Sequence, residues 1–167
     1  MLIEADKRAS AWSVPLTYSS SSEAQFFVPE NVHILGLMNT ADRSLAMVDY
    51  ALRRRFGFWT LKPQVGSSKF RLLLAERGIP APIIDVLINR IEELNKEIAD
   101  DTANLGPGYR IGHSYFCPEL PDGIEPVVWL RGVIETEIVP LLEEYWVDDP
   151  DLARRWAREL TSAVGSE

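Results

Sequence analysis

The sequence has 167 residues and a formal net charge of −8, with 46% hydrophobic and 25% charged residues. These proportions are typical of a globular chain and exclude a disordered one, and the length suits one ordinary domain or two small packed units. The single cysteine, Cys117, excludes an internal disulfide framework and favours a reducing compartment, so we expect a cytoplasmic protein. No apolar run approaches the roughly 20 residues that span a bilayer, and two distant histidines are too few for a zinc site.

The charge is unevenly distributed along the chain. Residues 1–62 carry seven basic and six acidic residues, a net charge of +1, whereas residues 63–167 carry ten and nineteen, a net charge of −9. An acidic surface is a poor partner for a phosphate backbone, and the one compact basic cluster, at residues 53–55, is too short for a nucleic-acid stripe. We therefore expect no direct DNA binding by this segment.

The first 62 residues predict mixed α/β structure. Residues 1–11 resemble the end of an interrupted helix, and residues 12–28 predict a β-hairpin whose two short strands are joined by a Ser-rich turn. The apolar run at residues 32–38 lacks polar alternation, which is typical of a strand buried on both faces of a parallel sheet. A short amphipathic helix then runs from Asn39 to about Arg54, and residues 56–61 predict another strand.

Beyond Pro63 the pattern becomes helical. The longest predicted helix spans about Ile83 to Ile98, where apolar residues recur every three or four positions. Shorter helices are predicted at residues 70–77, 127–141 with a kink at Pro140, and 152–160, with a short helix or turn at 109–116. We expect core positions for the tryptophans of this part, including Trp129, Trp146 and Trp156. The predicted fold is α/β over residues 1–62, followed by an all-α unit over residues 63–167.

The chemically informative stretch follows the apolar run at residues 32–38. In an open α/β sheet, ligands bind beyond the carboxyl ends of the strands, and Asn39 comes directly after such an end. Its amide can donate to a terminal phosphate oxygen and accept from an attacking water, as a nucleotide hydrolase requires. By itself, however, the Asn39–Asp42 segment also suits an ordinary turn and helix N-cap.

Three consecutive arginines, Arg53, Arg54 and Arg55, close the same predicted helix, about 15 residues and roughly 20 Å from Asn39 by helix rise. They cannot easily reach the same phosphate, but in a ring they can reach the nucleotide of a neighbouring subunit, where a permanently charged guanidinium stabilises the transition state. Alternatively, they complement the negative end of the helix, with Asp49 pairing to Arg53.

The order and spacing of these motifs strongly resemble McrB-type AAA+ GTPases. The resemblance rests on Met-Asn-Thr-Ala-Asp-Arg-Ser-Leu-Ala at residues 38–46 and Val-Asp-Tyr-Ala-Leu-Arg-Arg-Arg-Phe at residues 48–56. It continues at residues 6–8, 12–18, 28–31, 110–116 and 140–145, and so covers most of the chain. It implies the C-terminal part of an AAA+ module, in which a partial parallel sheet with helices precedes a helical lid.

The resemblance also implies residue roles. Asn39 is similar to the sensor-1 residue, and Asp42 and Arg43 complete the signature loop near the nucleotide. Arg54 and Arg55 resemble residues that act in trans at the subunit interface, with Arg53 less clearly placed. Arg110 opens the motif before the lid helices, where AAA+ proteins carry the sensor-2 arginine; it also suits an ordinary surface arginine. His113 and Tyr115 suit a base pocket or, as we expect, packing within the lid.

The implied activity is hydrolysis of GTP, or of ATP, with Mg²⁺. It would drive a homo-oligomeric ring that couples hydrolysis to DNA translocation in a 5-methylcytosine-specific restriction system, with an McrC-type nuclease subunit cutting the DNA. Methylated DNA would be recognised by a domain absent from this sequence. The preference for GTP rests on the resemblance alone, because no residue here indicates recognition of guanine.

The chain departs from the family pattern in one large respect. It contains no Gly-x-x-x-x-Gly-Lys-Ser/Thr sequence and no Asp-Glu pair after an apolar strand, the motifs that cradle phosphate and hold Mg²⁺. We therefore expect a fragment that neither binds nucleotide tightly nor hydrolyses GTP alone. Two alternatives stay open, an AAA+ ATPase of MoxR or remodelling type and a catalytically inert helical interaction module. An unpaired sheet edge could also allow the chain to dimerise.

Overall fold

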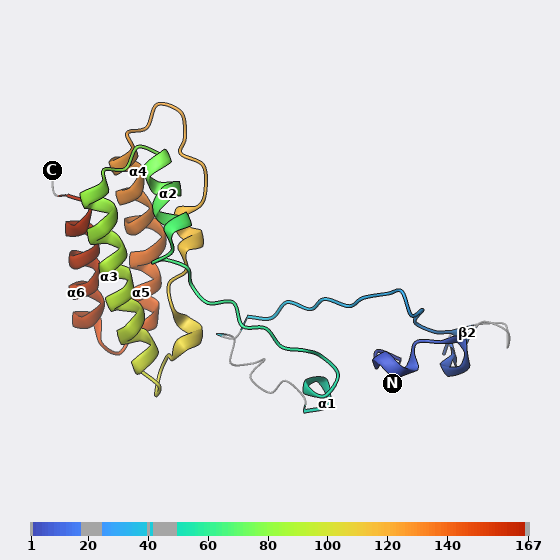
Figure 1. Cartoon of the computed structure of the whole chain (residues 1–167). Helices are drawn as coiled ribbons and strands as arrows, with labels where there is room; N and C mark the ends of the chain where they lie inside the picture. Colours follow the sequence, from blue (N-terminus) through green and yellow to red (C-terminus); the bar gives the residue numbers. More distant parts are fainter. Residues whose placement is uncertain (1, 18–24, 40, 42–49, 166–167) are drawn as a thin grey trace. The chain divides into compact units, whose positions relative to one another are not determined.

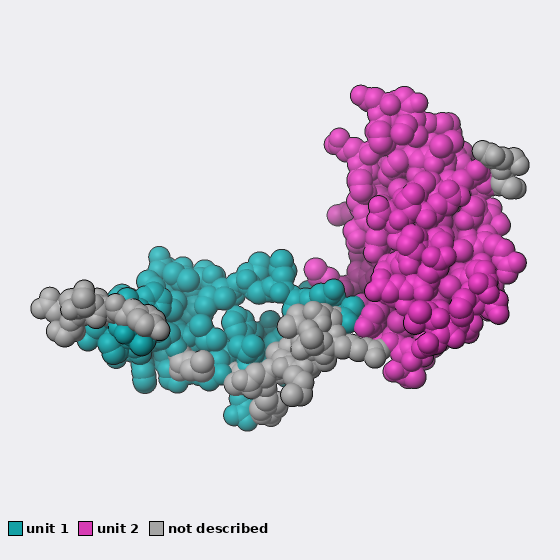
Figure 2. Space-filling view, turned by 180° about the vertical axis from the view of Figure 1, so that it is seen from behind, with its two compact units in different colours: residues 1–60 teal, residues 61–167 magenta. Residues whose placement is uncertain are grey.

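The structure is a computed structural model that describes residues 2–17, 25–39, 41 and 50–165. It divides into two compact units, Met1–Thr60 and Leu61–Glu167 (Figure 2). The units are described separately below.

The first unit contains short elements. Two short 3-10 helices, η1 (Ala5–Lys7) and η2 (Ser10–Trp12), lie where the sequence predicts the end of an interrupted helix. Strand β1 (Val14–Pro15) pairs antiparallel with β2 (Gln25–Phe26), in the two segments that the sequence predicts to form a hairpin. Of the helix predicted from Asn39, the structure describes its last turn, α1 (Tyr50–Arg53); residues 42–49 lie outside the described residues.

The apolar runs predicted as parallel strands do not form a sheet. Among the described residues, the only ladder is the antiparallel one between β1 and β2, and residues 32–38 and 56–61 are not in a strand. Leu35, Leu37 and Trp59 are 90%, 91% and 88% exposed. A central strand is stable only when neighbouring strands accept its N–H and C=O groups, and no such neighbour is found in the described part of the chain. The described residues therefore do not show the predicted parallel sheet, which stays a prediction.

The second unit is helical. Its elements are α2 (Ser68–Glu76), α3 (Ala81–Asp100), η4 (Pro107–Tyr109), η5 (His113–Phe116), α4 (Pro126–Val133), η6 (Ile134–Ile138), α5 (Val139–Tyr145) and α6 (Pro150–Ala163). Figure 1 shows α3, α5 and α6 running side by side, and α6 packs against both of the others. None of the described helices is long and apolar enough to cross a membrane.

Local sequence explains where these helices begin. The Ser67 hydroxyl accepts a hydrogen bond from the Phe70 N–H at 3.2 Å, which caps α2. The carboxylates of Glu125 and Asp149 cap α4 and α6 in the same way, at 2.8 and 3.1 Å. Such side chains satisfy N–H groups that have no partner within the helix. Proline in the first turn of α3, α4 and α6 costs little, because those N–H groups are unpaired in any case.

Helix α3 is the centre of the hydrophobic core. Leu87, Ile91, Leu94 and Ile98 are completely buried, as the sequence spacing predicts, while Ile83 is half-buried at the edge. Trp146 and Trp156 are also buried, which confirms their predicted core positions, and Trp129 is half-buried against the same core.

The helix predicted to kink or restart at Pro140 contains a π-helical turn just before that proline. Helix α4 continues through η6 into α5 without a break, and Pro140 lies in the first turn of α5. The Thr136 hydroxyl donates to the Gly132 carbonyl at 2.8 Å within this stretch. A wider turn next to proline accommodates the carbonyl that the missing proline N–H leaves unpaired, so the helix need not break.

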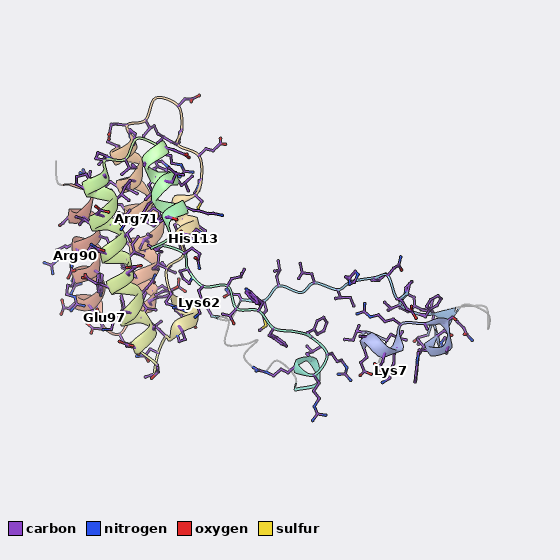
Figure 3. All side chains as sticks on the ribbon, in the orientation of Figure 1. Lys7, Lys62, Arg71, Arg90, Glu97 and His113 are labelled. Carbon is purple, nitrogen blue, oxygen red and sulfur yellow. The ribbon has the colours of Figure 1, made fainter. Side chains whose placement is uncertain are left out.

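Polar contacts fasten α3 to α6. Glu97 on α3 accepts hydrogen bonds from the Trp156 indole N–H at 2.8 Å and from Arg155 at 2.5 Å. Figure 3 labels Arg90 and Glu97, which lie about two helical turns apart on α3. Arg90 lies 3.6 Å from Glu159 on α6. Exposed ion pairs contribute little free energy, so these contacts set the alignment of two helices that apolar burial holds together.

Replacing a core residue tests this arrangement. Leu94→Ala should lower the free energy of unfolding by about 2–5 kcal/mol, because it removes completely buried methyl groups from α3 and leaves a cavity. Leu72→Ala on α2, at a side chain that is 58% exposed, should change it by less than about 0.5 kcal/mol. Urea denaturation followed by circular dichroism at 222 nm measures both; equal losses would contradict the proposed core.

Candidate functional site

Asn39 closes a turn in the first unit. Its side-chain oxygen accepts a hydrogen bond from the Ala41 N–H at 3.0 Å, and the residue is exposed. This is the local geometry that an asparagine typically adopts in an Asx turn. Asp42 and Arg43, the other predicted residues of this loop, lie outside the described residues.

The three arginines at the end of α1 differ in their surroundings. The Arg53 guanidinium lies 6.0 Å from the centre of the Phe58 ring, at the limit of a cation–π contact. Arg54 is exposed. Arg55 is half-buried and forms an ion pair with Glu4, with Nε 2.7 Å from the carboxylate Oε1. Arg55 is therefore held by its own unit, and Arg54 is the more accessible of the two arginines predicted to act in trans.

Arg55 also borders a hollow of about 370 Å³ within the first unit, lined by Ala5, Arg8, Glu30, His33, Ile34, Arg55, Phe56 and Gly57. Arg8 donates one hydrogen bond to the Val32 carbonyl and another, at 3.1 Å, to the Ile3 carbonyl. Arg8 thereby ties the first turn to the apolar run at residues 32–38, and this contact explains an arginine in the motif at residues 6–8.

The carboxylate of Glu4 is strongly stabilised in its charged form. Its hydrogen bond from Lys7 and, second, that from Arg55 lower the pKa of Glu4 from 4.5 to about 2. The same contact raises the pKa of Lys7. Hydrogen bonds to the charged form of an acid favour that form, so Glu4 stays ionised well below neutral pH. Glu4 is thus an anionic anchor for the side chain of Arg55.

Arg110 lies in the helical unit. It is half-buried, and its Nε–H donates to the Pro107 carbonyl at 2.9 Å. It lines a second hollow of about 370 Å³ together with Pro63, Val65, Gly66, Glu92, Asn95, Lys96 and Ala99. Arg110 and Lys96 bring two positive charges to this hollow, and Glu92 brings one negative charge.

The backbone on both sides of Arg110 is anchored. Ile111 is buried and exchanges two hydrogen bonds with the Asn95 side chain on α3: the Ile111 N–H donates at 2.5 Å and its carbonyl accepts at 2.9 Å. Tyr109 packs edge-to-face against Tyr145 on α5, with ring centres 5.4 Å apart. Burial, together with the nearby Tyr115 and Tyr109, raises the pKa of Tyr145 to about 12, consistent with an apolar setting.

His113 and Tyr115 pack within the helical unit. The His113 Nδ1 accepts a hydrogen bond from the Gln64 N–H at 3.3 Å, and its ring lies edge-on to Phe70 with the centres 6.1 Å apart. Tyr115 packs against the hydrophobic core. Neither residue lines the hollow beside Arg110.

Metal ligands are not clustered in the described part of the chain. Nowhere among those residues do three or more His, Cys, Asp or Glu side chains gather in a way that could hold a metal ion.

The sequence prediction missed the residues that surround Arg110. Asn95 carried a detectable signal, because it lies four residues after Ile91 and three before Ile98, on the apolar face of the predicted helix. Glu92 and Lys96 are exposed, and their part in the hollow depends on the approach of residues 63–66, which the spacing within α3 does not reveal. The contact between Glu4 and Arg55 joins residues far apart in sequence and carried no signal.

One comparison with known proteins gives a family match within the helical unit. The family model described as "McrB, alpha-helical lid domain" matches residues 86–154, which run from α3 into α6. Most of the helical unit is therefore similar to this lid domain, and the unit is called the lid below.

The second comparison covers nearly the whole chain. The chain is 52% identical over 161 residues to the "Type IV methyl-directed restriction enzyme EcoKMcrB subunit" of Escherichia coli (strain K12). That match covers 96% of this chain and 35% of the relative, so the chain spans about a third of the relative's length. The chain belongs to the McrB family, and the resemblance read from its motifs is confirmed.

The ionisation of Glu4 tests the contacts at the end of α1. Arg55→Ala should raise the pKa of Glu4 from about 2 toward 4.5, and Lys7→Ala should raise it further, because Lys7 is the larger cause. Since the folded pKa is depressed, the stabilisation from these contacts is complete above pH 4.5 and is lost as pH falls toward about 2. NMR titration of the Glu4 carboxyl carbon measures the shift. A wild-type pKa of about 4.5 would show that these contacts are not formed in solution.

Proposed function

We propose that this chain is part of the GTP-hydrolysing AAA+ motor subunit of a modification-dependent restriction system. The observation that carries the proposal is the 52% identity to the E. coli McrB subunit over 96% of this chain. In this proposal the subunits form a ring, hydrolysis drives translocation of DNA, and an McrC-type nuclease subunit cuts it. The 5-methylcytosine mark would be recognised by another domain of the protein.

In the proposed assembly, residues 32–38 and 56–61 become strands of the parallel AAA+ sheet. Their exposed apolar side chains, including Leu35, Leu37 and Trp59, support this proposal. Contact of apolar side chains with water is unfavourable, and exposed apolar patches often mark surfaces that pack against another part of a protein. As a strand end, Asn39 would exchange its hydrogen bond to Ala41 for contacts to the terminal phosphate and the attacking water. Asp42 and Arg43 would complete this loop.

The remaining charged residues would act on phosphate from two directions. Arg110 would extend from the lid toward the nucleotide of its own subunit. Arg54 and Arg55 would reach the nucleotide of the next subunit and stabilise the charge that spreads over the transferring phosphoryl group. For Arg55, this requires breaking the ion pair with Glu4. GTP with Mg²⁺ is the proposed substrate, with the phosphate cradle and the metal ligands supplied outside this chain.

Exchange of the matching segment tests the proposal. This chain, placed in the E. coli subunit in exchange for the segment that it matches, should support GTP hydrolysis. In that protein Arg54→Ala should lower kcat by roughly 10³- to 10⁵-fold, the range for arginines that contact a transferring phosphate from a neighbouring subunit. Arg158→Ala, at an exposed arginine on α6, is the matched control and should leave kcat unchanged.

Mixing two inactive variants separates action in trans from action in cis. Subunits with Arg54→Ala keep Asn39, and subunits with Asn39→Ala keep Arg54, so a mixed ring contains some complete sites. We expect partial recovery of hydrolysis on mixing. No recovery would contradict a role in trans, and full activity of the Arg54→Ala protein would favour the inert interaction module. Preference for ATP over GTP would favour an AAA+ ATPase of remodelling type.

A further inference from the structure

One polar side chain lies within the core of the lid. Among the described residues, Asn95 is the only buried residue of polar or charged type, with 8% of its surface exposed. It lies on α3 next to Leu94 and between Ile91 and Ile98, all three completely buried. An amide in such a place destabilises the fold unless its hydrogen bonds are formed, so its presence needs a structural explanation.

The explanation is the backbone of Ile111. Both functional groups of the Asn95 amide are used on this one residue: Nδ2 donates to the carbonyl at 2.9 Å, and Oδ1 accepts from the N–H at 2.5 Å. The pairing imitates one rung of a β-ladder, with a side chain in place of a second strand. Because both residues are buried, a side chain that lacks these groups would leave the Ile111 N–H and carbonyl unpaired.

The clamped residue directly follows Arg110. On the other side of Arg110, Tyr109 is held against Tyr145 with ring centres 5.4 Å apart. With both neighbours fixed, the Cα–Cβ direction of Arg110 is fixed as well, and its Nε–H lies 2.9 Å from the Pro107 carbonyl. Asn95 and Arg110 border the same hollow as Lys96.

We infer that Asn95 is the positioning residue of Arg110: its amide clamps Ile111 to α3 and so directs the neighbouring guanidinium toward the nucleotide phosphate. The phosphate contact rests on the proposed function, whereas the clamp itself rests on the two hydrogen bonds. Neither leucine nor aspartate would serve equally well. Leucine would fill the space but leave the Ile111 N–H and carbonyl unpaired, and aspartate would accept from the N–H but repel the carbonyl.

Hydrogen exchange in the 167-residue chain tests the clamp. Asn95→Ala should speed exchange of the Ile111 amide by roughly 10- to 100-fold, the scale of leaving a buried group unpaired. The amides of α6 should change much less. Asn89→Ala, at an exposed asparagine on the same helix, is the matched control and should leave Ile111 protected. If Asn95→Ala does not fold, Asn95→Leu keeps about the size of the side chain but has no acceptor for the Ile111 N–H, and it should give the same selective loss. An Ile111 amide that stays protected in the folded variants would overturn the inference.

A double-mutant comparison tests the link to Arg110. In the E. coli subunit carrying this chain, we expect Asn95→Ala and Arg110→Ala each to raise the KM for GTP. The double variant should be no worse than Arg110→Ala alone, because a positioning residue has no effect once the residue that it positions is gone. Independent, multiplying effects would mean that Asn95 is merely structural and would overturn the inference.

The two experiments separate the failure of the inference from the failure of the proposed function. If Arg110→Ala leaves GTP binding and hydrolysis unchanged, the phosphate contact proposed for Arg110 is wrong and the positioning role falls with it. Ile111 exchange then still decides whether the clamp exists as a feature of the lid. If Arg110→Ala is impaired and Asn95→Ala is not, the proposed function stands and the positioning role is refuted.

Discussion

Burial of one face of α3 is the constraint on which the helical unit depends. Leu87, Ile91, Leu94 and Ile98 are completely enclosed, and the other helices supply the apolar surface that covers them. A helix so deeply buried admits a polar side chain only where its polar groups have hydrogen-bond partners. The amide nitrogen and the amide oxygen of Asn95 each have one, and the backbone of Ile111 supplies both. The position of the Arg110 segment therefore follows from the packing of the core, which connects lid stability with the geometry of a candidate site.

In the first unit, by contrast, the apolar segments are exposed. Its apolar runs have neither strand partners nor a covering layer among the described residues, and Leu35 and Leu37 are about 90% exposed. Backbone groups of an apolar strand are satisfied mainly by a neighbouring strand, so these runs gain stability only when one is supplied. Within this unit, charged side chains make the contacts between segments. Glu4 forms ion pairs with Lys7 and Arg55, and Arg8 donates a hydrogen bond to the Val32 carbonyl. The second unit therefore has a hydrophobic core formed by its own residues, whereas the apolar runs of the first unit are not covered by its described residues.

This difference explains which sequence predictions succeeded. The helices of the second unit depend on contacts within about 100 residues that all belong to the chain, so the spacing of Ile91, Leu94 and Ile98 was enough to predict their burial. The parallel strands were predicted from apolar runs, but a run records only that a strand can be buried, not that partners are present. Arg110 was identified through family resemblance. Asn95, which positions it, was missed although its spacing from Ile91 and Ile98 places it on the apolar face, because that spacing does not reveal its partner, Ile111. The ion pair between Arg55 and Glu4 joins residues far apart in the sequence, and no local pattern predicts such a contact.

We expect the lid to fold by its own contacts, without residues 1–60. The most direct measurement is the free energy of unfolding of residues 61–167 expressed alone, compared with that of the helical unit within the whole chain. We predict one cooperative transition with the same midpoint in both, because the buried residues of the core all lie beyond residue 60. A shortened chain that keeps helical circular dichroism but loses cooperative unfolding would contradict this account, since it would show that the core requires the first unit.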